Sequence, residues 1–454
     1  MRRLHLLLLA AVFGLAGCAG LAGAPEAAKD RSPAFDGLAQ LLGPDDVDVL
    51  LVHGMCTRDM ENEPEQRWSH QAFLRLGMAL GVPPTGAEQG QQDGIAIHRR
   101  TFNLERGTVR ASAIVWSPLT QGLKRRLCYD QTHASPLCQP QSEAADHPSE
   151  AKGRALVNAL LKDRLLDDCL ADAMVFSGVA HAEMVARMQG AVLRALDPAR
   201  LDATPRSRDE AAAAVRELPL QRPLVFVTES LGSTLTFDAL ADLQQPDAIA
   251  SAAVDRASAR TALVFMFANQ LPILHLARQA LELSEPGVGA EGGRTGSRPT
   301  ALQSSLARFL MRSTPEVPAR RATHPVRVIS FNDRNDLLSY RLLSRGEPIA
   351  ERLDVIEVPV RNAVSVLGLF AAPTKAHNGH WSNPAVLRLL VCGHDSPTPC
   401  GSGPPPTSGS RRASPRARSA RPSRPRRVSR RSSSATSRAT TSCSARSNWC
   451  AGLP

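Results

Sequence analysis

The fold of this chain is decided by the stretch Val225-Phe226-Val227-Thr228-Glu229-Ser230-Leu231-Gly232-Ser233. The residues from Pro223 to Val227 form an apolar run with the length of a buried strand. A helical pattern begins at Thr234, so a tight turn centred on Ser230 joins the strand to the helix. Small neighbouring residues suit a strained serine backbone in such a turn, and the hydroxyl then projects beyond the end of the strand.

Similar apolar runs alternate with helical patterns along the rest of the chain. Further strands are expected at residues 47–52, 95–102, 109–116, 261–267, 325–331 and 354–360. Helices are expected at residues 66–80, 152–170, 181–196, 271–283 and 384–392. Residues 81–94 predict a polar loop, 118–152 an irregular segment and 284–300 a flexible loop. The alternation predicts an α/β fold with a mainly parallel sheet that helices cover on both faces.

The length and charge of the chain limit the classes of protein to which it can belong. Its 454 residues allow one large domain or two smaller ones, and 43% hydrophobic residues exclude a wholly disordered chain. The net charge of +11 suggests a nucleic-acid-binding protein. Residues 401–454, however, hold twelve Arg and no Asp or Glu, so residues 1–400 carry a net charge of −1. The charge of residues 1–400 therefore predicts that the folded part has no nucleic acid as a partner.

The N-terminus has the pattern of an export signal. A basic pair precedes an apolar stretch, residues 4–15, that is too short to span a bilayer. The following Leu15-Ala16-Gly17-Cys18 resembles the lipobox of bacterial lipoproteins, in which the cysteine thiol receives diacylglycerol. This resemblance predicts lipidation at Cys18, attachment to a membrane through that lipid anchor, and a place in the bacterial cell envelope. By resemblance to Gram-negative sorting, Ala19 favours the outer membrane, with the protein facing the periplasm.

Composition divides the chain into four parts. Residues 1–18 are the expected signal peptide, and residues 19–44, rich in Ala, Gly and Pro, are the expected tether. Residues 45–393 form the expected folded domain, with residues 118–222 inserted as a helical cap over the carboxyl edge of the sheet. Residues 394–454 are rich in Arg, Ser and Pro and predict a disordered tail, because such a composition cannot build a core.

An exported protein can form disulfides, and the cysteine spacing suggests two of them. Cys128 and Cys138 close a short loop and are the first expected pair, and Cys392 with Cys400 is the second. The sequence contains no CxxC pair, so it predicts no structural zinc and no other metal site.

Acidic and histidine side chains follow the later strands. Asp333 and Asp336 come directly after the strand expected at 325–331, while His377 and His380 lie between the last strand and the last helix. A carboxylate can orient a histidine, and that histidine can then take the proton of a serine hydroxyl. The order serine, aspartate, histidine, each after a strand, predicts nucleophilic catalysis around Ser230.

Together these motifs resemble the α/β-hydrolase superfamily over residues 45–393, and the resemblance implies its fold. It implies that Ser230 is the catalytic nucleophile. For the acid it favours Asp336, with Asp333 as the alternative, because the superfamily places this residue a few positions past the strand. For the base it favours His377, which has the usual spacing to the final helix, with His380 as the alternative.

The same resemblance implies where an oxyanion would be bound. The loop His53-Gly54-Met55 follows an apolar strand, as does the loop that supplies one oxyanion-hole amide in the superfamily. The two donors would be the backbone amides of Met55 and Leu231, and His53 would be structural. Thr228 departs from the superfamily pattern, because it stands where glycine is usual.

Two narrower similarities add little about the substrate. Ser230-Leu231-Gly232-Ser233, followed by Thr236 and Asp238, is similar to the nucleophile region of lipase and phospholipase branches. The chain is also similar to uncharacterised proteobacterial lipoproteins that share the segments at residues 116–120 and 268–272.

The activity implied by these resemblances is that of a membrane-anchored serine hydrolase. It would cleave carboxylic esters, lipids among them, through an acyl-enzyme and without a cofactor. The alternative is a catalytically silent lipoprotein of hydrolase fold that binds an envelope partner. Thr228 and Glu229, next to the expected nucleophile, are the residues that support this alternative.

Overall fold

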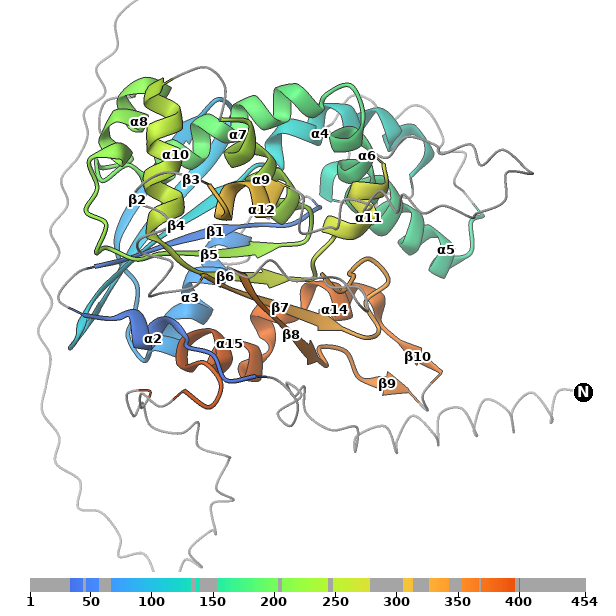
Figure 1. Cartoon of the computed structure of the whole chain (residues 1–454). Coiled ribbons are helices and arrows are strands. Elements are labelled where there is room, and N and C mark those ends of the chain that lie inside the picture. The colour runs from blue at the N-terminus through green and yellow to red at the C-terminus, as the bar shows by residue number, and fades with distance from the viewer. Residues whose placement is uncertain are drawn as a thin grey trace, which may run out of the picture. The chain divides into compact units, whose positions relative to one another are not determined.

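The computed structural model (Figure 1) describes residues 33–43, 46–56, 67–131, 136–138, 153–202, 206–243, 248–277, 305–312, 326–342, 353–366, 369–396 and 400. All of them belong to the first of two units, Met1–Gly403, and the second unit, Pro404–Pro454, lies outside the described residues. The expected signal peptide with Cys18, the loop at 284–300 and the tail from 401 onward also lie outside them.

An eight-stranded sheet of order β2-β3-β4-β1-β5-β6-β7-β8 forms the centre of the first unit. Its strands are β1 (Val47–Val52), β2 (Thr85–Gln92), β3 (Ile95–Leu104), β4 (Gly107–Val115), β5 (Leu224–Glu229), β6 (Thr261–Phe267), β7 (Val326–Asp333) and β8 (Leu353–Val360). Every neighbouring pair from β4 to β8 is parallel, and β3 is antiparallel to both of its neighbours. Strands β9 (Ser365–Val366) and β10 (Phe370–Ala371) form a separate pair. The mainly parallel sheet of the α/β prediction is confirmed.

Helices cover both faces of this sheet (Figure 1). One face carries α7 (His181–Leu196), α8 (Arg208–Arg216), α9 (Leu231–Asp242), α10 (Ala248–Arg260) and α12 (Ser305–Leu310). The other face carries α2 (Leu38–Leu41), α3 (Trp68–Leu80) and α15 (Pro384–Cys392). Leu50 and Val52 of β1 belong to the first core, while Val49 and Leu51 belong to the second. A strand buried on both faces needs apolar residues at every position, and β1 has them at five of six.

The segment expected as a cap divides into two parts that lie against different regions of the sheet. Its first part comprises α4 (Pro118–Lys124), η3 (Arg125–Asp130), η4 (Pro136–Cys138), α5 (Leu156–Leu160), the π-helix η5 (Leu161–Leu170) and α6 (Ala171–Ser177). This part reaches the carboxyl end of β1, because a disulfide joins Cys169 to Cys56. The second part, α7 and α8, packs on the face of the sheet. The expected extent of the cap, 118–222, is therefore wrong. Only the residues before α7 can form a cap, because α7 and α8 pack on the sheet.

Two segments expected to be irregular are ordered. The predicted loop at 81–94 contains β2, which pairs with β3 through the two-residue turn Asp93-Gly94. Both turn residues have positive φ, 52° and 83°, as a tight hairpin turn requires. Strand β2 is polar because it lies at the sheet edge with no position buried. Within 118–152, α4 and η3 replace the expected irregular chain.

Part of the expected tether belongs to the folded domain. Phe35 forms an antiparallel bridge with His394, with N···O distances of 2.9 and 2.8 Å, and Leu38 is fully buried. The domain therefore begins before residue 45 and extends past residue 393. The expected boundary was wrong because Phe35 and Leu38 are core residues. The Ala- and Pro-rich composition around them predicted a tether.

Disulfides join Cys128 to Cys138 and Cys392 to Cys400, which confirms both expected pairs. A third disulfide, between Cys56 and Cys169, was not predicted.

The remaining helices are α11 (Leu271–Leu276), α14 (Pro373–Asn378) and η7 (His380–Ser382). Among the described helices none is by itself long and apolar enough to cross a membrane, although Leu156–Ser177 and His181–Leu196 together, bent by 98°, pass that test by composition.

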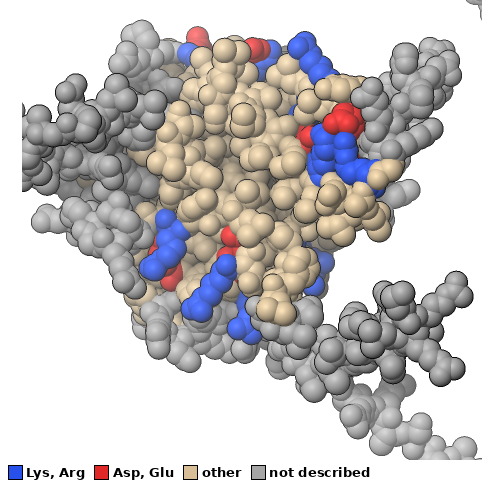
Figure 2. Space-filling model, turned by 90° about the vertical axis from the view of Figure 1, so that its right-hand side faces the viewer, with Lys and Arg blue, Asp and Glu red and all other residues tan. Residues whose placement is uncertain are grey.

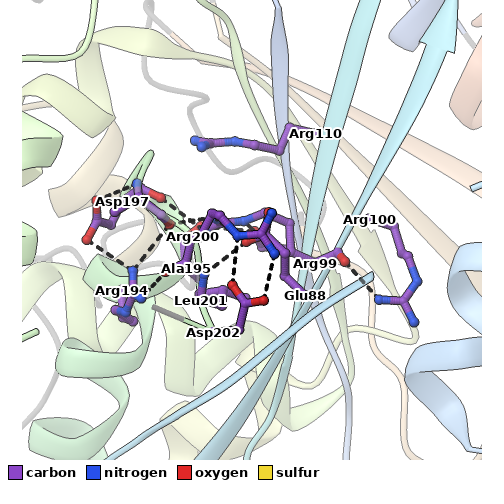
Figure 3. Close-up of polar contacts among 12 residues, drawn as sticks. Glu88, Arg99, Arg100, Arg110, Arg194, Ala195, Asp197, Arg200, Leu201 and Asp202 are labelled. Carbon is purple, nitrogen blue, oxygen red and sulfur yellow. Dashed lines mark hydrogen bonds and ion pairs between the residues drawn. The ribbon is translucent and has the colours of Figure 1, made fainter. Parts of the chain in front are cut away.

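A buried arginine fastens the edge hairpin to the sheet-covering helix α7 (Figure 3). Arg99 of β3 is 2% exposed and donates to Ser112 Oγ at 3.1 Å and to Glu88 Oε2 at 3.3 Å. Its other bonds go to three carbonyl oxygens at and beyond the end of α7, those of Ala195, Asp197 and Ala199. The guanidinium thus satisfies carbonyl groups that the end of a helix leaves without intrahelical donors.

Candidate active site

Ser230 lies in the turn between β5 and α9, with a backbone conformation that few residues adopt. Its φ is 54° and its ψ is −130°, and its amide donates to Phe267 O at 2.8 Å. The turn is possible because the neighbouring positions are small. A Cβ on Gly232 would lie 2.1 Å from His53 O, and one on Gly54 would lie 2.8 Å from the Cβ of Ser230. The two loops therefore approach each other only because both positions are glycine.

The structure brings Ser230, His377 and Asp336 together from three separate segments. His377 Nε2 lies 2.9 Å from Ser230 Oγ, and His377 Nδ1 lies 2.8 and 3.0 Å from the two carboxylate oxygens of Asp336. The consistent hydrogen-bond pattern has Nδ1–H donating to Asp336 and Ser230 O–H donating to Nε2. This arrangement prepares the serine oxygen for loss of its proton to the histidine.

Asp333, the alternative acid, accepts hydrogen bonds from backbone amides and the Asn335 side chain and not from His377. Its carboxylate accepts the amides of Asn362 and Ala363, the latter at 3.2 Å, and the amide of Asn335 at 2.8 Å. Asn362 in turn donates to Ala376 O at 2.9 Å, next to His377. Asp333 therefore holds the loop after β8, which supports the histidine segment.

His380, the alternative base, is also away from the serine. It is fully buried, its Nδ1 bonds His377 O at 3.0 Å, and its ring stacks on Phe267 with centroids 5.4 Å apart. Burial lowers the pKa of His380, although the charge of Glu229 opposes the change. A neutral, stacked ring at this position packs the core behind the site.

The charge state of Asp336 fits its contact with His377. Burial by itself would raise the pKa of Asp336, but the hydrogen bond and charge of His377 act in the opposite direction. The amide of Leu338 and the hydroxyl of Ser339 also stabilise the carboxylate, and the net effect is a lowered pKa. Asp336 is therefore ionised at neutral pH and orients the imidazole.

The two expected oxyanion donors belong to the segments that meet at the serine. Leu231 is the first residue of α9, so its amide has no acceptor within the helix. Met55 follows Gly54, where an added Cβ would lie 2.8 Å from Ser230 Cβ, and no hydrogen bond of the Met55 amide is found among the described residues. His53 is structural: its Nε2 accepts the amides of Trp116 and Ser117 at 3.1 Å, and its Nδ1 bonds Gly54 O.

The two unusual residues before the serine have buried partners. Thr228 Oγ1 accepts the hydroxyl hydrogen of Ser233 at 2.8 Å. The Thr228 side chain, which stands where glycine is expected, is thus bound to the first turn of α9. Glu229 is 2% exposed, and its Oε2 accepts Trp68 Nε1–H at 3.0 Å. Neither contact displaces Ser230 from His377.

Sequence reasoning missed a buried acid that holds the loop after β1. Asp172 of α6 accepts the amide of Cys56 at 2.7 Å and the hydroxyl of Thr120 at 2.6 Å, and it pairs with Lys124 Nζ at 3.0 Å. Burial raises the pKa of Asp172, against the charge of Lys124. Cys56, directly after Met55, has a φ of 80° and is also linked to Cys169. No local motif marks Asp172, because its partners are distant in sequence.

Removing the disulfide between Cys56 and Cys169 is expected to lower the free energy of unfolding. The bridge closes a loop with a sequence separation of 113 residues, and such bridges typically contribute about 2 to 4 kcal/mol. The variant Cys56→Ser/Cys169→Ser should therefore unfold at a lower urea concentration. Cys128→Ser/Cys138→Ser is the matched control, because its loop spans 10 residues and should contribute less. An equal decrease in the free energy of unfolding in both variants would contradict this prediction.

A pocket opens beside the histidine. Its lining includes Leu165 and Cys169 of η5, Leu337, Pro373 and His377. Ser230 itself is fully buried. The lining of this small pocket is largely apolar. Among the described residues, no group of three or more His, Cys, Asp or Glu side chains is placed to hold a metal ion.

Comparison of the chain with models of protein families finds no match. Comparisons with curated proteins and with solved structures likewise find no similar protein. The chemistry of the site therefore rests on its own geometry.

Proposed function

We propose that this protein is a serine hydrolase that cleaves carboxylic esters, with an α/β-hydrolase fold and α4–α6 as a small cap. The observation that carries the proposal is the continuous hydrogen-bonded chain from Ser230 through His377 to Asp336. The strained serine at a strand-to-helix turn and two adjacent backbone amides add to its support.

In the proposed reaction, Ser230 Oγ attacks the ester carbonyl carbon while His377 Nε2 accepts the serine proton. The amides of Met55 and Leu231 bind the negative oxygen of the tetrahedral intermediate. His377 then gives the proton to the departing alkoxide, which leaves as the alcohol. Water attacks the acyl-serine in the same way, with His377 as base, and releases the acid and the free serine. Asp336 keeps the imidazole in the required tautomer throughout.

We place the protein in the bacterial cell envelope, attached to the outer membrane through lipidated Cys18 and facing the periplasm. The lipobox sequence supports this location. Three disulfides among the described residues also fit an oxidising compartment outside the cytoplasm.

One observation favours a second candidate, a catalytically silent lipoprotein that binds an envelope partner. Ser230 is fully buried, and the pocket reaches His377 and Asp336 without Ser230 in its lining. A hydrolase needs side chains beside the pocket to move before an ester can reach the serine.

A fluorophosphonate probe distinguishes the two candidates, because it reacts with activated serines. The test uses the chain from residue 18 onward with Cys18→Ser, alone and with Ser230→Ala or Ser233→Ala. Ser233 is a matched control, since it is buried three residues away and contacts Thr228 and not His377. The expected result is a label on Ser230 by mass spectrometry, kept in Ser233→Ala and lost in Ser230→Ala. No label on folded protein would reject the hydrolase and favour the binding protein.

A further inference from the structure

The helical segment Leu156–Ser177, which contains α5, η5 and α6, directs its acidic side chains inward. Four aspartates of this segment are buried, each at most 6% exposed: Asp163, Asp167, Asp168 and Asp172. A surface helix in water has the opposite pattern, with charged residues outside and apolar ones inside.

The buried carboxylates have cationic partners. Lys124, fully buried on α4, pairs with Asp168 at 2.8 Å and Asp172 at 3.0 Å. Lys162 pairs with Asp167 at 2.9 Å. Arg154 lies 3.9 Å from Asp163. The inward pattern is therefore a built arrangement, because each of the four buried aspartates lies within 4 Å of a lysine or arginine nitrogen.

The outward side of the same segment is mostly apolar. Its exposed apolar side chains, called the apolar face below, are Leu156, Val157, Leu160, Leu161, Leu166, Leu170 and Met174. Leu156, Val157 and Met174 are 75%, 66% and 69% exposed, while Asn158, Arg164 and Ser177 are the exposed polar residues of the segment. Figure 2 looks at the side of the molecule that carries α5 and α6, and a broad area of it shows no Lys, Arg, Asp or Glu.

The apolar face continues into the pocket of the candidate active site. Leu165 and Cys169 come from η5 and line that pocket together with His377. Leu337 also lines the pocket and is 66% exposed. Apolar surface thus runs from the outside of the molecule to the histidine.

We propose that the apolar face docks on the acyl-chain region of a lipid bilayer, so that the pocket receives lipid esters directly from the membrane. The substrate part of this proposal rests on the proposed function. A lipid surface fits because the face is broad and nearly uncharged, as in helices that lie in a bilayer interface. Lipidation at Cys18 would keep the membrane within reach, because the fourteen residues between Cys18 and Pro33 extend to about 50 Å at most.

Flotation with phosphatidylcholine vesicles tests the docking. The chain begins at residue 18 with Cys18→Ser, so no acyl chain contributes, and carries Ser230→Ala, so no lipid is cleaved. The variant Leu156→Glu/Val157→Glu/Met174→Glu should lower the partition coefficient at least about tenfold, because charges enter hydrocarbon poorly. Met174→Glu alone should lower it several-fold. Met78→Glu is the matched control, a 73% exposed methionine on α3, and should bind like the parent chain.

Three results would overturn the docking proposal. These are no flotation of the parent chain, equal flotation of the triple variant, or a self-associating parent chain that dissociates in the triple variant without binding vesicles. Circular dichroism checks that the variants are folded.

The substrate part is tested in the chain that retains Ser230. Hydrolysis of a diacylglycerol in vesicles should fall at least about tenfold in the triple variant, while hydrolysis of a water-soluble butyrate ester stays unchanged. An equal decrease in the rate of hydrolysis of both esters in the triple variant would overturn the substrate part of the proposal. Flotation without any serine labelling would reject only the hydrolase, and labelling without flotation would reject only the docking.

Discussion

Asp336→Asn is expected to lower kcat/KM for ester hydrolysis about 10⁴-fold. Asp336 accepts Nδ1–H of His377 at 2.8 Å and so leaves Nε2 free to accept the proton of Ser230. The asparagine amide can instead donate to Nδ1, and the imidazole then carries its proton at Nε2. A histidine in that tautomer cannot act as the base for the serine.

Asp333→Asn provides the comparison, because it makes the same chemical change three residues earlier. Asp333 binds the amides of Asn335, Asn362 and Ala363 and has no hydrogen bond to His377. Its replacement should lower the free energy of unfolding by about 1 to 3 kcal/mol, because buried amides lose an acceptor, and change kcat/KM less than about tenfold. Rates with a soluble chromogenic ester measure both variants. Similar kcat/KM values for the two variants would reject Asp336 as the acid of the site.

Arg99→Met is expected to lower the free energy of unfolding by about 3 to 5 kcal/mol. The substitution keeps much of the aliphatic stem but removes all five hydrogen bonds that the guanidinium donates. Glu88 loses a cationic partner, and the carbonyl groups at the end of α7 lose their donors. Burial lowers the pKa of Arg99 to about 10, so the side chain is still charged at neutral pH.

Arg100→Met is the matched control on the next position of β3. Arg100 is partly exposed, donates to Arg99 O at 2.9 Å and lies 5.6 Å from the centre of the Phe73 ring. Its loss should cost about 1 kcal/mol or less. Urea titrations of both variants, followed by circular dichroism, compare the two positions. A loss at Arg99 no larger than that at Arg100 would show that the buried network contributes little.

The elements that position the site could be predicted from local sequence. The strand and turn around Ser230, the strands at 47–52 and 261–267, and the helices at 181–196 and 384–392 lie at the expected residues. These segments are apolar enough for burial to decide their structure. The choice of Asp336 and His377 needed more than local pattern, because Asp333 and His380 share their segments. Resemblance to a known spacing favoured the pair that the structure brings to Ser230.

What could not be predicted depends on contacts between distant segments. Strand β2 contains no apolar stripe, because it lies at the sheet edge, although Asp93-Gly94 is a recognised signal for a tight turn. Arg99 occupies an inward position of β3 where alternation predicts an apolar residue. Asp172 is distinguished only by its contact with Cys56, and local sequence carries no sign of which residues that segment meets.

The bridge between Phe35 and His394 affects the order in which this protein can be completed during synthesis. Phe35 leaves the ribosome before any strand of the sheet, whereas its partner residue is made only after all eight. The segment around α2 therefore waits for α15, which it contacts through the bond from Gln40 Nε2 to Cys392 O. A nascent chain that has not yet reached residue 394 cannot complete this contact. The closing step of folding must then follow synthesis of the whole sheet.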